Sequence, residues 1–177
     1  MKKFLLVVVA MLCVATVSAQ SKFESSVKQA AQTVASQKWS VGLRVGSGLQ
    51  ADAECFYAAD KYVELRFGMQ YVAGLNADFT ILHNWNVCTM NWTPRAGKWF
   101  LDAGVGANVG GKGHYAYVGV AGQVKLGIKF DAAPVRLALD FTPSFGPGIM
   151  YFKETGAGAW FNKWGLCNLG LSATYCF

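Results

Sequence analysis

The chain has 177 residues, 53% of them hydrophobic and 14% aromatic, with 20 glycines and a formal net charge of +6. A mildly basic chain without runs of Lys or Arg lacks the charged footprint of a nucleic-acid-binding protein, so we expect no nucleic-acid partner. Beyond the N-terminus, no uninterrupted apolar segment reaches the roughly 20 residues that a membrane helix needs. The hydrophobic residues are instead spread along the chain by alternation.

The N-terminus is typical of an exported protein. Residues 1–19 contain a lysine pair, an apolar run and the small residues Val17-Ser18-Ala19. This order predicts a secretory signal peptide. Its removal takes away two lysines and leaves a net charge of +4. We interpret residues 20–38 as a periplasmic tether with weak helical spacing, and residues 39–177 as the folded domain.

From residue 39 onward, apolar and polar residues alternate with a period of two, which predicts β-strands. The number of predicted strands is even, and many are close to the roughly 9–11 residues that a tilted strand needs to cross a bilayer. The predicted fold class is all-β, an eight-stranded antiparallel up-and-down transmembrane β-barrel. Its strands are expected at residues 39–45, 51–57, 62–71, 75–88, 99–109, 115–130, 135–145 and 164–177.

The last predicted strand has an apolar face that includes Leu169, Leu171, Tyr175 and Phe177. Lipid is the expected cover for this face. A strand in lipid must have both edges paired, so the last strand should close a barrel against the first. A soluble barrel of the lipocalin type would place its apolar side chains inside. Here the charged face also carries the glycines, which indicates that the polar face is the crowded inner one.

The inward face of the predicted barrel carries charges of both signs. Buried charges must be paired, so we expect a network of ion pairs that closes the lumen. Neighbouring strands should bring Lys125 beside Asp140. The predicted network consists of Arg44, Asp52, Glu54, Glu64, Arg66, Asp78, Asp102, Lys125, Lys129, Arg136 and Asp140.

The two rims are predicted to differ. Short turns at 58–61, 93–97 and 131–134 indicate a periplasmic rim, and aromatic residues on the outward face beside them predict a membrane girdle. The girdle residues are Trp39, Tyr57, Trp99, Phe130 and Phe177. His83 also falls on the outward face, which requires either a bulge or a neutral imidazole among aromatic rings.

The longest connection is predicted at the opposite rim, over residues 146–163. It is the candidate for external recognition, because binding residues often lie on loops that a rigid scaffold carries. Alternatively, the seventh and eighth strands extend past the membrane here, and their aromatic residues form an outer girdle. The aromatic candidates are Tyr151, Phe152, Trp160 and Phe161.

No pattern predicts a metal site, a cofactor or a catalytic group. The exported part contains Cys55, Cys88, Cys167 and Cys176, with no CxxC pair. Their pairing stays open, although their positions in predicted strands favour a role as small apolar residues. A grouping of His114, Ser144 and Asp140 would be needed for a lipid-modifying enzyme of the lipid A deacylase kind. A narrow channel is the other alternative.

Five segments carry a resemblance to one family of proteins. They are Val41–Gly46, Val118–Gln123, Gly127–Phe130, Leu137–Pro143 and Tyr175–Phe177. With them the chain is similar to the small eight-stranded outer-membrane barrels of the OmpA/OmpX type, especially the short single-barrel proteins of the Bacteroides group. The resemblance implies a monomer in the cell envelope of a Gram-negative bacterium, in contact with membrane lipid and lipopolysaccharide, with a non-enzymatic structural or surface-interaction role. It also implies that the outer-membrane assembly machinery reads the C-terminal strand.

Overall fold

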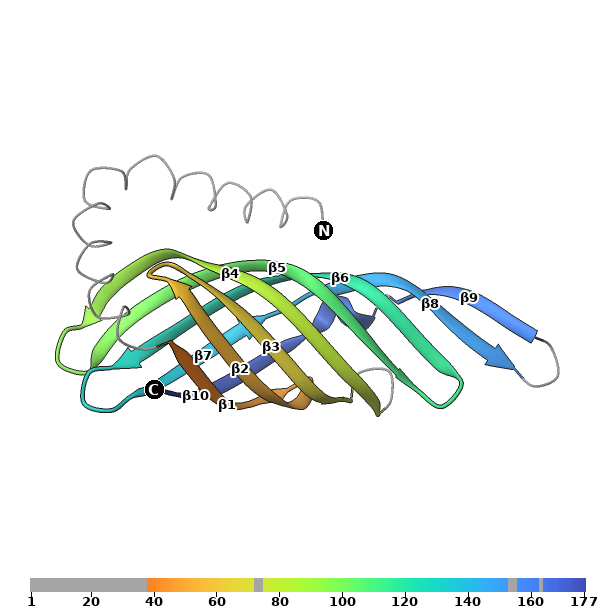
Figure 1. Cartoon of the computed structure of the whole chain (residues 1–177), viewed down its shortest axis with the longest axis horizontal. Coiled ribbons are helices and arrows are strands. Elements are labelled where there is room, and N and C mark those ends of the chain that lie inside the picture. The colour runs from red at the N-terminus through yellow and green to blue at the C-terminus, as the bar shows by residue number, and fades with distance from the viewer. Residues whose placement is uncertain (1–37, 72–74, 153–155, 163) are drawn as a thin grey trace.

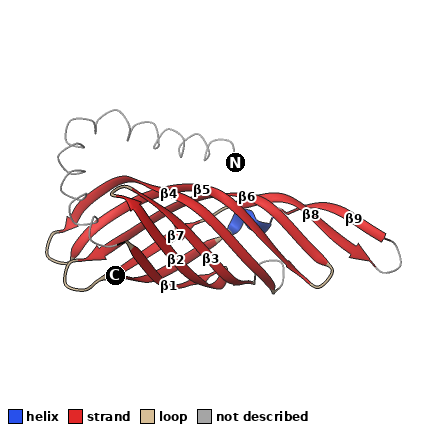
Figure 2. Ribbon diagram, viewed as in Figure 1, coloured by secondary structure: helices blue, strands red, loops and turns tan. Residues whose placement is uncertain are grey.

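The fold is built almost entirely of antiparallel strands (Figures 1 and 2). The computed structural model describes residues 38–71, 75–152, 156–162 and 164–177. The predicted signal peptide and nearly all of the tether lie outside the described residues. The elements are β1 (Trp39–Gly46), β2 (Gly48–Ala58), β3 (Lys61–Gln70), β4 (Asn76–Thr93), β5 (Gly97–Lys112), β6 (Tyr115–Phe130), β7 (Val135–Phe141), β8 (Ser144–Phe152), β9 (Gly156–Asn162), a 3-10 turn η1 (Trp164–Cys167) and β10 (Leu169–Cys176).

Eight of these strands close into a barrel. Each strand from β1 to β6 pairs with the next, and β10 pairs with both β7 and β1. The last pairing runs from Ser40 opposite Cys176 to Gly46 opposite Gly170. The predicted closure of the last strand against the first is therefore confirmed, as is the all-β, eight-stranded antiparallel barrel. No helix in the described residues is long and apolar enough to cross a membrane.

The connections from β7 to β8 and from β8 to β9 differ from the prediction. β6 pairs with β7 through residues 124–129 and with β8 through residues 115–121. β7 and β8 thus pair one after the other with the same strand, β6. The pairing is interrupted near Pro143, which has no N–H to donate. β8 and β9 then form a hairpin that extends beyond the closed ring (Figure 1). The expected loop at 146–163 was wrong for most of its length, because β8 and β9 are strands, as the alternative predicted. The outer aromatic girdle of that alternative stays a prediction.

The eighth strand also begins later than predicted. Residues 164–167 form the 3-10 turn, and regular pairing starts at Leu169. Cys167 therefore lies outside a strand. At the opposite rim β4 is longer than expected, because it continues to Thr93 past an irregularity between Asn86 and Cys88. The four described cysteines are free thiols.

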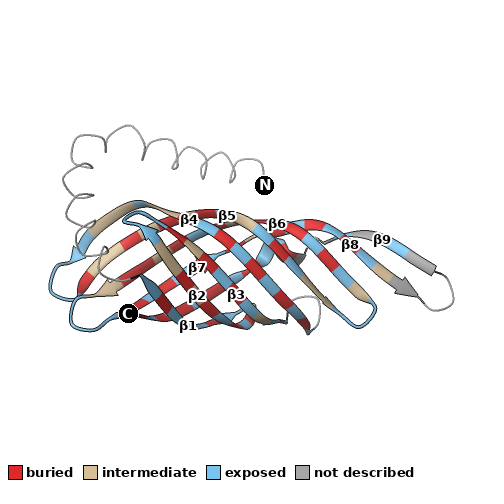
Figure 3. Cartoon of the chain, in the orientation of Figure 1, coloured by how far each residue is buried: buried red, intermediate tan, exposed pale blue. Residues whose placement is uncertain are grey.

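The barrel is apolar outside and polar inside. Buried and exposed residues alternate along the strands (Figure 3). On the outer face, the exposed fraction is 55% for Val120, 56% for Leu139 and 52% for Leu171. Period-two alternation produces this arrangement because successive side chains of a strand point to opposite faces. A water-soluble barrel would show the opposite distribution.

The two ends of the barrel can be named from their connections. The short-turn rim carries the turns at 59–60, 94–96 and 131–134, together with the C-terminus (Figure 1). The hairpin rim carries the β1–β2 turn at Ser47, the β5–β6 turn and the β8–β9 hairpin. At the β5–β6 turn, Gly113 has a φ of 56°, which a glycine adopts without the steric cost of a Cβ.

Candidate functional site

The interior of the barrel contains a dense set of charged side chains. Strand alternation turns these residues inward from β1 to β7. The structure buries ten of the eleven predicted members, with at most 7% of any of them exposed. The ten are Arg44, Asp52, Glu54, Glu64, Arg66, Asp78, Asp102, Lys125, Arg136 and Asp140.

One end of the network is centred on Asp140. The Arg44 guanidinium donates to it from Nε, at 2.9 and 3.0 Å, and from Nη2, at 2.8 Å. Arg66 Nη1 lies 3.3 Å from the same carboxylate and donates to Thr142 at 2.9 Å. Two guanidinium groups from β1 and β3 thus hold one carboxylate from β7. Such charge-assisted bonds are the stronger class of hydrogen bond.

The network continues through Lys125. Its Nζ lies 2.9 Å from Glu54 Oε1 and 2.8 Å from Glu64 Oε2, so it joins β6 to β2 and β3. Arg66 also contacts Glu64. Arg136 contacts Glu54 at 2.6 Å and Asp102 at 3.2 Å. Opposite charges therefore alternate without a break from Asp140 to Asp102.

Asp78 is held by neutral groups. Its carboxylate accepts from Gln50 Nε2 at 2.6 Å, from Tyr117 OH at 2.8 Å and from Thr80 Oγ1 at 3.1 Å, and Asn108 also donates to it. These neutral partners were not predicted from the sequence. The only indication of them in the sequence is their position: on β2, β4, β5 and β6 they fall on the same alternate, inward-facing positions as the charged residues.

A pocket of about 110 Å³ lies where the charge network reaches the short-turn rim. The Arg136 guanidinium carbon lies 5.1 Å from the ring centroid of Phe56 and 4.2 Å from that of Phe100, which favours cation–π attraction. Lys129, the eleventh predicted member, lines this pocket and is only half-buried. It therefore lies on the inward side, as predicted, but is less enclosed than the other ten.

Close packing inside the barrel requires glycines. A Cβ at Gly170 would collide with the guanidinium of Arg44, and a Cβ at Gly104 would collide with the Asn84 amide. Arg44 cannot easily move away, because it is fully buried and its guanidinium also donates to Gln50 at 3.0 Å. The glycines therefore provide the space that the longer inward side chains occupy.

We expect Gly170→Ala to lower the free energy of unfolding by about 1–3 kcal/mol, the usual range for overpacking. The added methyl group would push Arg44 away from Asp140. Gly122→Ala is the matched control, because its Cβ would meet nothing within 4 Å. Urea titration of the two refolded variants, followed by tryptophan fluorescence, measures the difference. Equal midpoints for the two variants would contradict the tight fit around Arg44.

The predicted girdle residues lie beside the short-turn rim. Trp39, Tyr57 and Phe177 are 47%, 55% and 61% exposed, whereas Trp99 and Phe130 are half-buried. His83 is exposed on the outer face. It contacts the Tyr57 hydroxyl through Nε2, and its ring lies 6.0 Å from that of Trp85. The second of the two predicted settings, an imidazole among aromatic rings, is the one the structure has.

The hydrolase-like grouping is not assembled. β6 pairs Tyr115 with Met150 and Ala121 with Ser144, so Ser144 lies about 20 Å along the strand from the turn that carries His114. Asp140 is occupied by two arginines. The expectation that His114, Ser144 and Asp140 could meet was wrong. Among the external aromatic candidates, Phe161 is 51% exposed, and the side chains of Tyr151, Phe152 and Trp160 lie outside the described residues.

Comparisons with known proteins give one similar structure. No family model matches the chain, and no curated protein matches its sequence. The N-terminal β-barrel domain of OprF from Pseudomonas aeruginosa has 13% sequence identity and a TM-score of 0.45. The alignment covers 78% of this chain and 95% of that domain. The assignment as a closed eight-stranded barrel rests on the chain's own strand pairing.

Proposed function

We propose that this chain is an integral outer-membrane β-barrel that has a structural or surface-interaction role rather than an enzymatic one. The observation that carries the proposal is the inverted distribution of its side chains. Large apolar residues are exposed on the outside of the ring, and charged residues are enclosed within it. Lipid is the solvent that suits such a surface, and a closed barrel leaves no unpaired strand edge along the ring.

The proposed orientation follows from the two rims. The short-turn rim faces the periplasm, since short turns are typical of that side, and the hairpin rim faces the exterior. Membrane lipid and lipopolysaccharide are then the main contacts of the monomer. β10 ends beside Phe177, which is 61% exposed and is the group offered to the outer-membrane assembly machinery. Kinship with the short barrels of the Bacteroides group belongs to the same proposal.

A surface interaction would use the β8–β9 hairpin. Its residues on the outward face include Ile149 and Phe161, which are 61% and 51% exposed. On the opposite face of the hairpin, β8 contributes Gly148, which has no side chain and pairs with Trp160 of β9. The hairpin projects beyond the ring (Figure 1), a position that suits contact with another envelope component.

Purified outer membranes test the proposal. We expect the protein in that fraction, with a faster gel migration before boiling than after, because a detergent-resistant barrel stays folded in the unheated sample. A known periplasmic protein and a known outer-membrane barrel serve as fractionation controls. A chain in the soluble fraction that migrates at one position, boiled or unboiled, would contradict the proposal.

We also predict that the barrel does not conduct ions. Eight strands enclose a lumen that side chains just fill, whereas aqueous channels occur in barrels of about 16 strands. The continuous chain of ion pairs from Asp140 to Asp102 lies across this space. Reconstitution in planar bilayers should give no unit conductance steps. Protein-dependent steps that change when Arg44 or Glu64 is replaced would overturn the prediction.

A further inference from the structure

The buried charges of the barrel do not balance. Among the described residues, the buried set contains six carboxylates and four cations, which leaves an excess of two negative charges. Four of the carboxylates have a basic partner within ion-pair distance. The other two are Asp78 and Asp52. Asp78 has its four neutral donors, so the uncompensated group is Asp52.

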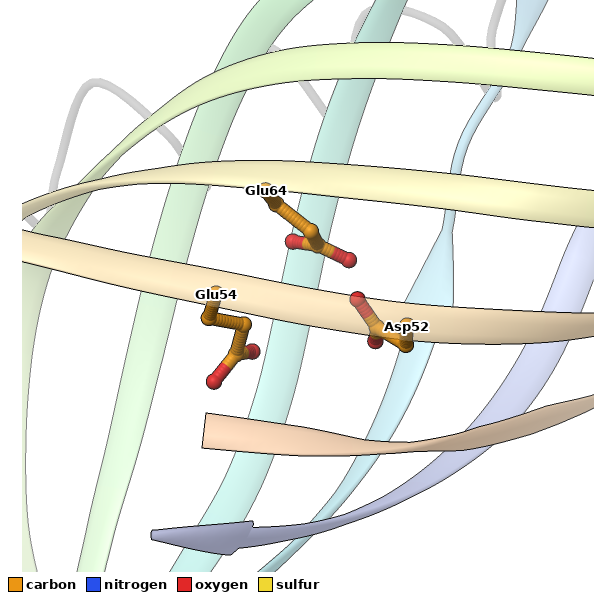
Figure 4. Close-up of side chains that lie close together, drawn as sticks. All are labelled: Asp52, Glu54 and Glu64. Carbon is orange, nitrogen blue, oxygen red and sulfur yellow. The ribbon is translucent and has the colours of Figure 1, made fainter. Parts of the chain in front are cut away.

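Asp52 is the unusual member of the network. It is 1% exposed, and neither of its carboxylate oxygens has a hydrogen-bond partner among the described residues. Burying a carboxylate without a partner is strongly unfavourable. Asp52 also lies in an acidic cluster, because oxygens of Asp52, Glu54 and Glu64 lie within 4.8 Å of one another. Figure 4 shows the Asp52 carboxylate directed toward Glu64.

The strand register makes this cluster. Asp52 and Glu54 are two residues apart on β2 and so share its inner face, and Glu64 on β3 lies directly opposite Glu54. Like charges at facing positions of a sheet are destabilising unless something compensates them. Lys125 compensates the two glutamates. It makes no ion pair with Asp52 among the described contacts, so one carboxylate remains to be neutralised.

We propose that Asp52, Glu54 and Glu64 form a binding site for a divalent cation of the class that prefers oxygen ligands, Ca²⁺ or Mg²⁺. Asp52 would supply its two free oxygens, and each glutamate would share one oxygen with the ion. Carboxylate oxygens are the preferred ligands of both ions. A divalent cation would neutralise Asp52 and offset the net negative charge of the buried set. The ion would join β2 to β3 beside Lys125 and thereby stabilise the folded barrel.

The first test uses the refolded barrel after treatment with EDTA, with folding verified by gel migration so that the result does not depend on membrane location. We expect Ca²⁺ or Mg²⁺ to raise the urea midpoint of the wild type, and about one ion per chain by elemental analysis after dialysis. Asp52→Asn should fold but lose both effects. Asp131→Asn, which changes an exposed acid in the β6–β7 turn, should keep them.

A second variant separates the ion from a merely structural role of Asp52. Lys125→Met removes the ammonium that repels the ion, so it should bind Ca²⁺ at least about tenfold more tightly than the wild type does. Adding Asp52→Asn to this variant should abolish the gain. If the wild type and Asp52→Asn respond equally to the ions, or if neither responds, no cation binds here and Asp52 is enclosed as an uncharged acid. Either result would overturn the proposal.

Discussion

In metal-free buffer, Lys125→Met is expected to lower the free energy of unfolding by about 3–5 kcal/mol, the usual cost of removing one partner from a buried ion pair. Lys125 is 1% exposed and contacts two glutamates at 2.8 and 2.9 Å. Without it, Glu54 and Glu64 face each other across β2 and β3 and lose the one cation that they share. Equilibrium unfolding in urea, on barrels refolded in detergent, measures the change.

The control for this experiment is Lys112→Met. Lys112 is exposed at the end of β5, and surface substitutions usually change stability by less than about 0.5 kcal/mol. The two variants therefore lose the same charge and the same side-chain length in different surroundings. Equal midpoints for the two variants would show that the Lys125 ion pairs do not support the fold.

Leu139→Arg is expected to lower stability in lipid bilayers by about 2–4 kcal/mol, the range for a basic side chain on the lipid face near the bilayer midplane. Leu139 is 56% exposed on the outer face of β7. Leu49→Arg is the matched control, since Leu49 is also exposed but lies next to the β1–β2 turn at the hairpin rim. At that depth the cost should fall to about 0–1 kcal/mol. Equal costs at both positions would contradict a lipid-facing belt.

Residue alternation was sufficient to predict most of the ring. β6 has Val118, Val120 and Val124 on one face and Lys125 on the other, so its period of two is plain in the sequence. Over the β8–β9 hairpin, extended strands were predicted only as the alternative to a loop, because Gly146-Pro147-Gly148 are residues that usually mark turns. Backbone pairing along the edge of the long β6 strand overrides that local preference, since β8 continues the hydrogen bonds that β7 begins.

The membership of the interior network was predictable, but its pairing was not. Inward parity identifies the buried charges, whereas the choice of partner depends on side-chain reach across the lumen. Lys125 and Asp140 are register neighbours on β6 and β7, as expected, yet their described ion pairs go to other residues. Nothing in the sequence distinguishes Asp52, whose carboxylate has no hydrogen-bond partner among the described residues, from Glu54 two positions later. That difference appears only when the lumen is seen in three dimensions.

Collision measurements on spin labels test whether lipid covers the outer face of the ring. Nitroxide labels would be placed singly at Val120, at Leu139 and at Asp131 in the β6–β7 turn, after replacement of the free cysteines and reconstitution in liposomes. If lipid covers the outer face, labels at Val120 and Leu139 should collide often with oxygen and rarely with a water-soluble nickel chelate, and the label at Asp131 should do the reverse. Access of the nickel chelate to Leu139 equal to its access to Asp131 would contradict the membrane barrel.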